Sequence, residues 1–176
     1  MKIRLTEEAT ARLKAQSQAW PIPQKAKAFA QGDIRLTAVL RHCPRRMWSF
    51  TLKKTHWTIA QVLWHLADQE ANLYVRLRLA AAQPGSFVSS YDQEIWADRL
   101  AYPKAPAEQA RDLILLLRKA NSDLLARIPR RAWKGKVEHP EWGTKDLEYM
   151  VALNIWHLEH HLRQMERRLR EWKAGK

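Results

Sequence analysis

The sequence has one cysteine, Cys43, and only five glycines in 176 residues. A single cysteine excludes an intramolecular disulfide and any zinc site built from several cysteines. The scattered glycines exclude a glycine-rich phosphate-binding loop, and no Gly-x-Ser-x-Gly elbow is present. Cys43 has basic neighbours in RHCPRR that would lower the pKa of a nucleophile, but before a proline we expect a half-buried structural thiol.

Long hydrophobic runs are also absent. The longest aliphatic stretch, Leu113–Leu117, is far too short to span a membrane. The N-terminal segment MKIRLTEEATARLK lacks the apolar core that a signal peptide needs. We therefore expect a cytoplasmic protein without a membrane span.

Proline is restricted to a few places and leaves four long windows free of it. Helix interiors exclude proline, and each window has helical periodicity and strong helix formers. These windows are residues 24–43, 45–83, 107–128 and 141–176. Short connections between them predict an all-α protein, a four-helix bundle with additional short helices before residue 20 and at 92–100. We expect 1–176 to form one domain, with 1–29 as an N-terminal extension.

Capping residues predict where these helices begin. Thr58 opens a capping box, so the second helix should begin there and end before Pro84. The third should begin at Pro106, and the fourth after Gly143, capped by Thr144 with Asp146 near the positive end of its dipole. Gly32 and Asp33 either interrupt the first helix or start it, and residues 133–142 suggest a short hairpin or an irregular loop.

Three of the seven histidines lie close together in IWHLEHHLRQ, residues 155–164. At about 100° per residue, His157 and His161 are roughly 40° apart on the inward face, whereas His160 points toward the edge of the bundle. Imidazoles at i and i+4 can both reach one ion at about 2.0–2.1 Å. Two ligands hold a divalent metal weakly, so a third is expected from another helix. His65, at an inward position of the second helix, is the candidate.

Both a structural and a metal-binding role are open for these histidines. A lone histidine on an apolar face is usually a neutral, hydrogen-bonded core residue, but three inward histidines together favour metal ligands. Three neutral imidazoles would leave coordination positions open, as catalytic sites do, for Zn, Ni, Fe or Mn. An open position could hold water as a hydroxide nucleophile or a thiol as thiolate.

Five other residues are candidates for the same site. Gln69 and Asn154 share helix faces with the histidines and could orient them, or they could simply be polar residues in the bundle interior. Asp92 and Trp96, in YDQEIWAD, would cover the mouth of the site, although we favour an N-cap role for Asp92 and Trp96 could be a packing residue. Arg76 could bind an anionic group of a substrate, or lie at a solvated helix end.

The order of HLADQE, YDQEIWADRL, HPEWGT and a final helix with HxxxH resembles the DinB/YfiT-like superfamily of metalloenzymes, over roughly residues 30–170. That superfamily includes bacillithiol S-transferases and mycothiol-dependent isomerases. The resemblance implies a four-helix bundle and a divalent metal held by His65, His157 and His161. It also implies a low-molecular-weight thiol as cosubstrate and, as in some relatives, a homodimer.

The resemblance thus favours a metal-dependent enzyme that activates a low-molecular-weight thiol for S-transfer to a small electrophile. A metal-dependent hydrolase using a metal-bound hydroxide is one alternative. A basic nucleic-acid-associated protein is another, because 31 Lys and Arg against 18 Asp and Glu give a net charge of +13. Cations alternate with aromatic residues in RRMWSFTLKKTHW, as in single-strand binders: Arg45, Arg46, Lys53 and Lys54 beside Trp48, Phe50 and Trp57.

Overall fold

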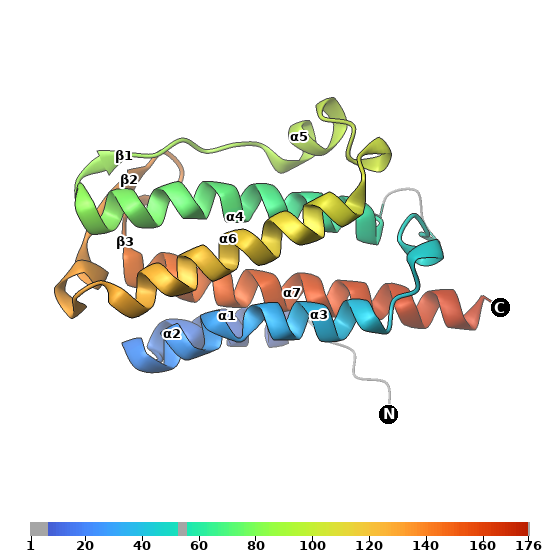
Figure 1. Ribbon diagram of the computed structural model, residues 1–176, viewed down its shortest axis with the longest axis horizontal. Coiled ribbons are helices and arrows are strands. Elements are labelled where there is room, and N and C mark those ends of the chain that lie inside the picture. Colours follow the sequence, from blue (N-terminus) through green and yellow to red (C-terminus); the bar gives the residue numbers. More distant parts are fainter. Residues whose placement is uncertain (1–6, 53–55, 176) are drawn as a thin grey trace.

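Four long helical segments lie side by side and form the body of the molecule (Figure 1). The computed structural model describes residues 7–52 and 56–175. Its bundle consists of α3 (Gly32–Arg41), which α2 (Ile22–Ala30) extends, α4 (Ile59–Ala82), α6 (Ala107–Arg127) and α7 (Leu147–Ala174). The predicted all-α four-helix bundle is confirmed.

The first bundle segment is interrupted at Gln31, and the residue that follows, Gly32, meets two other helices at close range. α2 ends at Ala30 and α3 begins at Gly32. A Cβ at Gly32 would overlap the guanidinium group of Arg118, on α6, and the side chain of Leu158, on α7. Glycine is therefore required where three helices converge. Of the two alternatives for Gly32 and Asp33, the structure shows a helix that starts at Gly32, directly after a break from α2.

The other helix boundaries follow local capping. The capping box of Thr58 and Gln61 is formed, with the Gln61 N–H donating to the Thr58 hydroxyl at 3.2 Å. α6 begins one residue after Pro106, and α5 (Gln93–Arg99) is capped by Asp92. Short 3-10 turns occupy connections between these helices: Arg45–Met47, Tyr102–Lys104 and Arg130–Lys134.

A small three-stranded sheet closes one end of the bundle (Figure 1). Its strands are β1 (Ser86–Phe87), β2 (Lys136–His139) and β3 (Gly143–Asp146). β2 pairs in parallel with β1 and antiparallel with β3, so the expected hairpin is formed and gains a third strand. The sheet ties the segment that follows α4 to the segment that precedes α7.

The predicted cap of the last helix was wrong. Thr144 pairs within the hairpin, and its hydroxyl donates to the Glu138 carboxylate at 2.8 Å. Because strand pairing continues to Asp146, the helix begins only at Leu147. The Asp146 carboxylate caps it by accepting from the Tyr149 N–H at 2.7 Å.

The N-terminal helices pack on the last helix. α1 (Glu7–Ala19) includes Ser17, whose hydroxyl donates to the Ala152 carbonyl of α7 at 3.1 Å. Lys25 of α2 is buried and donates to the Glu148 carboxylate at 2.6 Å. These contacts attach residues before 30 to the bundle, and the expected single domain stays a prediction.

The core consists of two apolar clusters with buried polar residues among them. One includes Leu63 and Leu162, and the other, near the sheet, includes Leu77 and Val137. Cys43 lies in the first cluster, where burial raises the pKa of its thiol to about 11. The thiol is therefore protonated at neutral pH, which agrees with a structural role.

Within residues 7–52 and 56–175, no helix combines the length and apolar character that crossing a membrane requires.

Candidate metal centre

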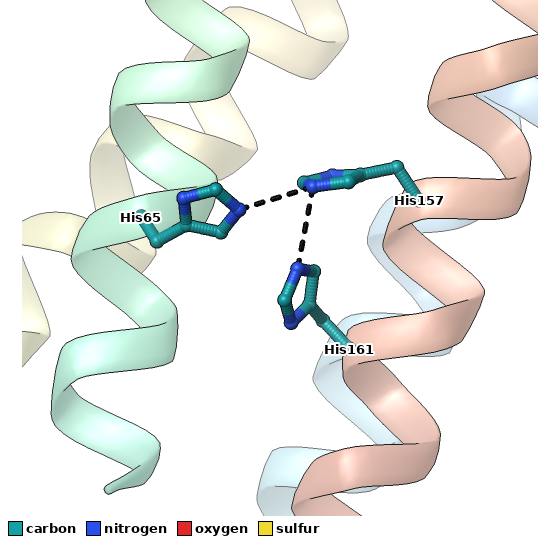
Figure 2. A group of neighbouring side chains, drawn as sticks. All are labelled: His65, His157 and His161. Atoms are coloured by element: carbon teal, nitrogen blue, oxygen red, sulfur yellow. Dashed lines mark hydrogen bonds between the residues drawn. The ribbon is translucent and has the colours of Figure 1, made fainter. Parts of the chain in front are cut away.

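The side chains of His65, His157 and His161 converge between two helices (Figure 2). His65 extends from α4 and the other two from α7. The Nε2 atom of His157 lies 3.0 Å from that of His65 and 3.2 Å from that of His161. Two nitrogens bound to one ion at about 2.0–2.1 Å lie roughly 3.3 Å apart in tetrahedral geometry. These two distances are therefore close to those between ligands of one ion, and the ligand atoms of all three residues lie within 4.8 Å of one another.

The proton positions of these imidazoles also fit a metal. The His161 Nδ1–H donates to the Gln164 side-chain oxygen at 2.9 Å, so its Nε2 presents a lone pair. Nδ1 of His65 and of His157 is buried without a hydrogen-bond partner. A single hydrogen on His157 Nε2 cannot satisfy both facing nitrogens. One cation among the three Nε2 atoms would satisfy all three Nε2 lone pairs, and it would leave the Nδ1–H groups of His65 and His157 without an acceptor.

All three imidazoles are held in the neutral form. Burial lowers the pKa of His65 to about 4 and that of His161 to about 3. Burial also lowers the pKa of His157 well below its usual value, and the other imidazoles and Arg118 add to the effect. Because a metal requires an unprotonated nitrogen, the site keeps its ligands ready to bind at neutral pH.

Acid should destabilise the metal-free protein through these histidines. Their pKa values are low in the folded state but near 6.5 in the unfolded chain, so below pH 6.5 the unfolded chain binds more protons. Stability should therefore fall as the pH falls from about 6.5 toward 4, by up to about 1.4 kcal/mol per unit for each histidine. Urea unfolding of chelator-treated protein across that window measures it.

His161→Gln should make this pH dependence less steep, because one of the titrating imidazoles is removed. His42→Gln, at an exposed position outside the cluster, serves as the control for the loss of a histidine. Equal slopes for His161→Gln and the unchanged protein would contradict the assignment.

His160 is not part of the cluster. It is partly buried at the edge of the bundle, with its ring 5.6 Å from the Trp156 ring and 5.1 Å from the His161 ring. This confirms the outward direction that helical periodicity predicts and makes His160 a natural control for the three inward histidines.

A cleft of about 790 Å³ leads to the histidines. His65 and His157 line it together with polar and aromatic residues from α1, α4, the segment before α5, the hairpin and α7. The lining residues used below are Lys14, Gln69, Arg76, Tyr91, Asp92, Glu94, His139, Glu141, Trp142 and Trp156. The cleft gives a small molecule access to the candidate metal position.

Gln69 and Asn154 lie next to the histidines but bind each other. The Asn154 side-chain amide donates to the Gln69 side-chain oxygen at 2.7 Å and accepts from Arg118 at 2.8 Å. Neither forms a hydrogen bond with the three imidazoles in the described part of the chain. Gln69 also lines the cleft, so its role toward a bound molecule stays a prediction.

The other three candidates take different positions. Asp92 caps α5, accepting from the Glu94 and Ile95 N–H groups at 2.8 and 3.0 Å, and it also lines the cleft. Trp96 lines a neighbouring pocket, and its ring packs 4.4 Å from that of Tyr91. Arg76 lines both pockets and is only 7% exposed, so it is not at a solvated helix end.

Two features lie beyond what the sequence indicated. The buried pair of Arg118 and Glu70 connects α6 to α4 beside the histidines. His139 and Trp142 stack face to face in the cleft, with ring centroids 3.9 Å apart. Glu70 is the last residue of the motif HLADQE, and His139 and Trp142 belong to the motif HPEWGT. The motifs therefore contained these residues, but their sequence did not indicate that Glu70 pairs with an arginine or that the two rings stack.

Some side chains of the basic and aromatic segment RRMWSFTLKKTHW pack against the rest of the protein. Trp48 is buried, with its indole N–H donating to the Cys43 carbonyl at 2.9 Å, and Arg45 pairs with Glu108. Lys53 and Lys54 lie outside the described residues. A nucleic-acid partner stays a prediction that rests on charge.

Three converging imidazoles inside a helical bundle are the donor set of a metal-binding protein. The chain belongs to the DinB superfamily, whose family model matches residues 28–165. A protein of Oceanobacillus iheyensis named "putative metal-dependent hydrolase" is 34% identical over 106 residues, which cover 60% of this chain and 61% of that protein. The match thus spans less than two thirds of that relative. A Bacillus cereus protein with the same name is 27% identical over 126 residues, 72% of each chain.

Solved structures share the fold. YfiT from Bacillus subtilis, described as "a probable metal-dependent hydrolase with an unusual four-helix bundle topology", matches with a TM-score of 0.76 at 19% identity, over 98% of this chain and 93% of that one. A mycothiol-dependent maleylpyruvate isomerase matches with a TM-score of 0.66 at 14% identity, over 83% of this chain and 61% of that one. At these identities the similarity establishes the fold alone.

Proposed function

We propose that this protein is a metal-dependent enzyme in which His65, His157 and His161 hold a divalent ion. The observation that carries the proposal is the convergence of three neutral imidazoles, with Nε2 atoms 3.0 and 3.2 Å apart, at a cleft. The names of the relatives, metal-dependent hydrolases, support it. Imidazole nitrogen suits Zn, Ni, Fe and Mn, so the donor set leaves the choice among these metals open.

We infer further that the site activates a low-molecular-weight thiol for S-transfer to a small electrophile. A divalent ion bound there would supply Lewis acidity and lower the pKa of a thiol or a water. The groups that lower the imidazole pKa values electrostatically are other imidazoles and, for His157, Arg118. Neutral ligands leave the charge of an ion uncompensated, which favours an anionic group beside it.

Activation of a thiol and activation of water differ in how much each needs a base to remove the proton. A thiol has a pKa near 8.5 and loses its proton far more readily than water does. The site has no carboxylate hydrogen-bonded to the three imidazoles within the described residues, so a base is not built in beside them. The thiol dependence of the structurally similar mycothiol-dependent isomerase adds support.

Hydrolysis is the second candidate. The relatives are named for it, and Asp92, Glu94 and Glu141 line the cleft, where a carboxylate could accept a proton from water. The two reactions use the same ligands and differ in whether turnover requires a thiol.

Metal content by mass spectrometry tests the site first. We expect near-stoichiometric metal in the unchanged protein and in His160→Ala, and its loss in His65→Ala and His161→Ala, because two imidazoles hold a divalent ion weakly. His160→Ala is the matched control, one residue from a ligand and outside the cluster. No metal after reconstitution with Zn, Ni, Fe and Mn would mean that these histidines are structural.

Turnover then separates the two reactions. With 1-chloro-2,4-dinitrobenzene, the thiol sulfur forms a bond to the ring carbon, chloride leaves and the thiol proton passes to solvent. We expect this reaction to require both thiol and metal. Ester hydrolysis that proceeds without thiol and disappears with the metal would instead establish the hydrolase.

A further inference from the structure

Arg76 is a buried cation without an ion-pair partner. Its side chain is 7% exposed, and its guanidinium donates to the Ser89 carbonyl at 2.5 Å and lies 5.7 Å from the Trp142 ring centroid. Across residues 7–52 and 56–175 no carboxylate forms an ion pair with it. Buried arginines are normally paired, so this guanidinium is prepared for an anion from outside the chain.

His139 supplies a second donor at the same place. Its Nδ1 accepts from the Glu141 N–H at 3.2 Å, so the proton of the neutral imidazole is on Nε2. Burial and the nearby Arg76 lower the pKa of His139, which keeps the ring neutral. The Nε2–H donates to no group in the described part of the chain, and the ring is held in the cleft wall by stacking on Trp142.

Tyr91 supplies a third donor. Burial raises the pKa of its phenol to about 12, so the hydroxyl is protonated at neutral pH. Arg76, Tyr91 and His139 line the same cleft, and Arg76 acts electrostatically on the other two. The hydroxyl forms no hydrogen bond within the described residues. Its ring is positioned by packing on Trp96.

We propose that Arg76, His139 and Tyr91 form a recognition site for a carboxylate on the thiol or the electrophile. A guanidinium, an imidazole N–H and a phenol O–H together offer donors for both oxygens of a carboxylate. This inference rests on the proposed function, because it places the reacting sulfur at the histidines. Glu141 acts electrostatically on Arg76 and His139. Its carboxylate, like those of Asp92 and Glu94, is exposed to water and forms no hydrogen bond with these donors in the described residues.

The helix determines the length of such a ligand. His65 and Arg76 lie on α4 about three turns apart, which corresponds to roughly 16 Å along the axis. A molecule that reaches both has its thiol or electrophilic centre at one end and its carboxylate at the other, joined by a spacer, and both side chains reach into the same cleft. Small thiols such as 3-mercaptopropionate are too short to contact both.

Calorimetric titration of the metal-loaded protein with paired probes tests the site. 11-Mercaptoundecanoic acid and 11-mercapto-1-undecanol have the same length and thiol, and differ in the carboxylate. We expect the acid to bind at least about tenfold more tightly than the alcohol, because charge-assisted hydrogen bonds form only with the acid. 3-Mercaptopropionic acid and 3-mercapto-1-propanol are the short pair, and the difference between them measures the preference for an acid that arises at the metal alone.

Substitutions test whether the preference for the long acid depends on the proposed residues. Arg76→Met and His139→Phe should reduce the preference for the long acid to below about twofold, and the phenylalanine preserves an aromatic ring against Trp142. Lys14→Met is the matched control. It removes another cation that lines the cleft, one that lies 5.2 Å from the Trp156 ring, and should preserve the preference. Equal affinity of the long acid and alcohol for the unchanged protein, or a preference that Arg76→Met retains, would overturn the proposal.

Cobalt-substituted protein keeps the two proposals distinguishable. Cobalt bound to a thiolate has a charge-transfer absorption band that reports thiol binding at the metal independently of the carboxylate. A band with every thiol but no preference for the acid would refute the recognition site and leave thiol activation intact. An Arg76-dependent preference for the acid without any band would support the recognition site and refute thiol activation.

Discussion

Replacing Arg118 with methionine should lower the free energy of unfolding by about 3–5 kcal/mol, because it leaves a carboxylate buried without its cation. Arg118 and Glu70 are each 2% exposed at their side chains and form an ion pair. Arg118 also donates to the Asn154 side chain at 2.8 Å and to the Phe29 carbonyl at 2.9 Å. One guanidinium therefore links α6 to α4, α7 and the end of α2. Urea denaturation of the metal-free protein measures the loss.

A charge removed from the surface of the same helix gives the comparison. Lys119 is adjacent in sequence, 72% exposed at its side chain and paired with Asp123. Lys119→Met should change stability by less than about 0.5 kcal/mol. Arg118→Met combined with Glu70→Met should be more stable than Arg118→Met alone, since no unpaired charge remains. Similar losses for Arg118→Met and Lys119→Met would show that the buried pair contributes little.

Metal should stabilise the folded protein by about 4 kcal/mol when free zinc exceeds the dissociation constant about 1,000-fold. The ion binds nitrogens that converge only in the folded state, from two helices whose ligands His65 and His157 are 92 residues apart in the sequence. For a domain of this size, such a gain raises the melting temperature by about 8–16 °C. Thermal unfolding with and without zinc, monitored by circular dichroism, measures the shift.

The histidine variants make this measurement specific. His161→Ala should abolish the shift, whereas His160→Ala should preserve it. A shift of equal size in both variants would mean that zinc binds elsewhere on the protein. The readout depends on binding and not on turnover, so it is informative before any substrate is known.

Helical periodicity predicted the inward direction of His157 and His161 because both lie on one regular helix, where the angle per residue is constant. That His65 meets them depends on how α4 packs against α7, which periodicity within a single helix does not determine. Their convergence agrees with the expectation from inward faces, and the structure adds the Nε2 distances of 3.0 and 3.2 Å.

Long-range contacts explain what the sequence could not predict. Arg118 and Lys119 are adjacent cations after an aliphatic run, and only packing against Gly32 and Glu70 distinguishes the buried one from the exposed one. Likewise, Thr144 and Asp146 are both good helix caps. Pairing with β2 decided between them, and strands of two to four residues are too short to show an alternating pattern.

The sheet holds the segments beside α4 and α7 together through its main chain, so its cleft-facing side chains are not needed to keep the helices in place. Main-chain hydrogen bonds, such as that from the Val88 N–H to the Glu138 carbonyl at 3.0 Å, join the segments beside α4 and α7. Such bonds do not depend on which side chains the strands carry. Residues at the sheet end of the cleft, including His139 and Trp142, can therefore be exchanged while the helices still bring the three imidazoles together. The architecture lets ligand preference diversify on a preserved metal-binding scaffold.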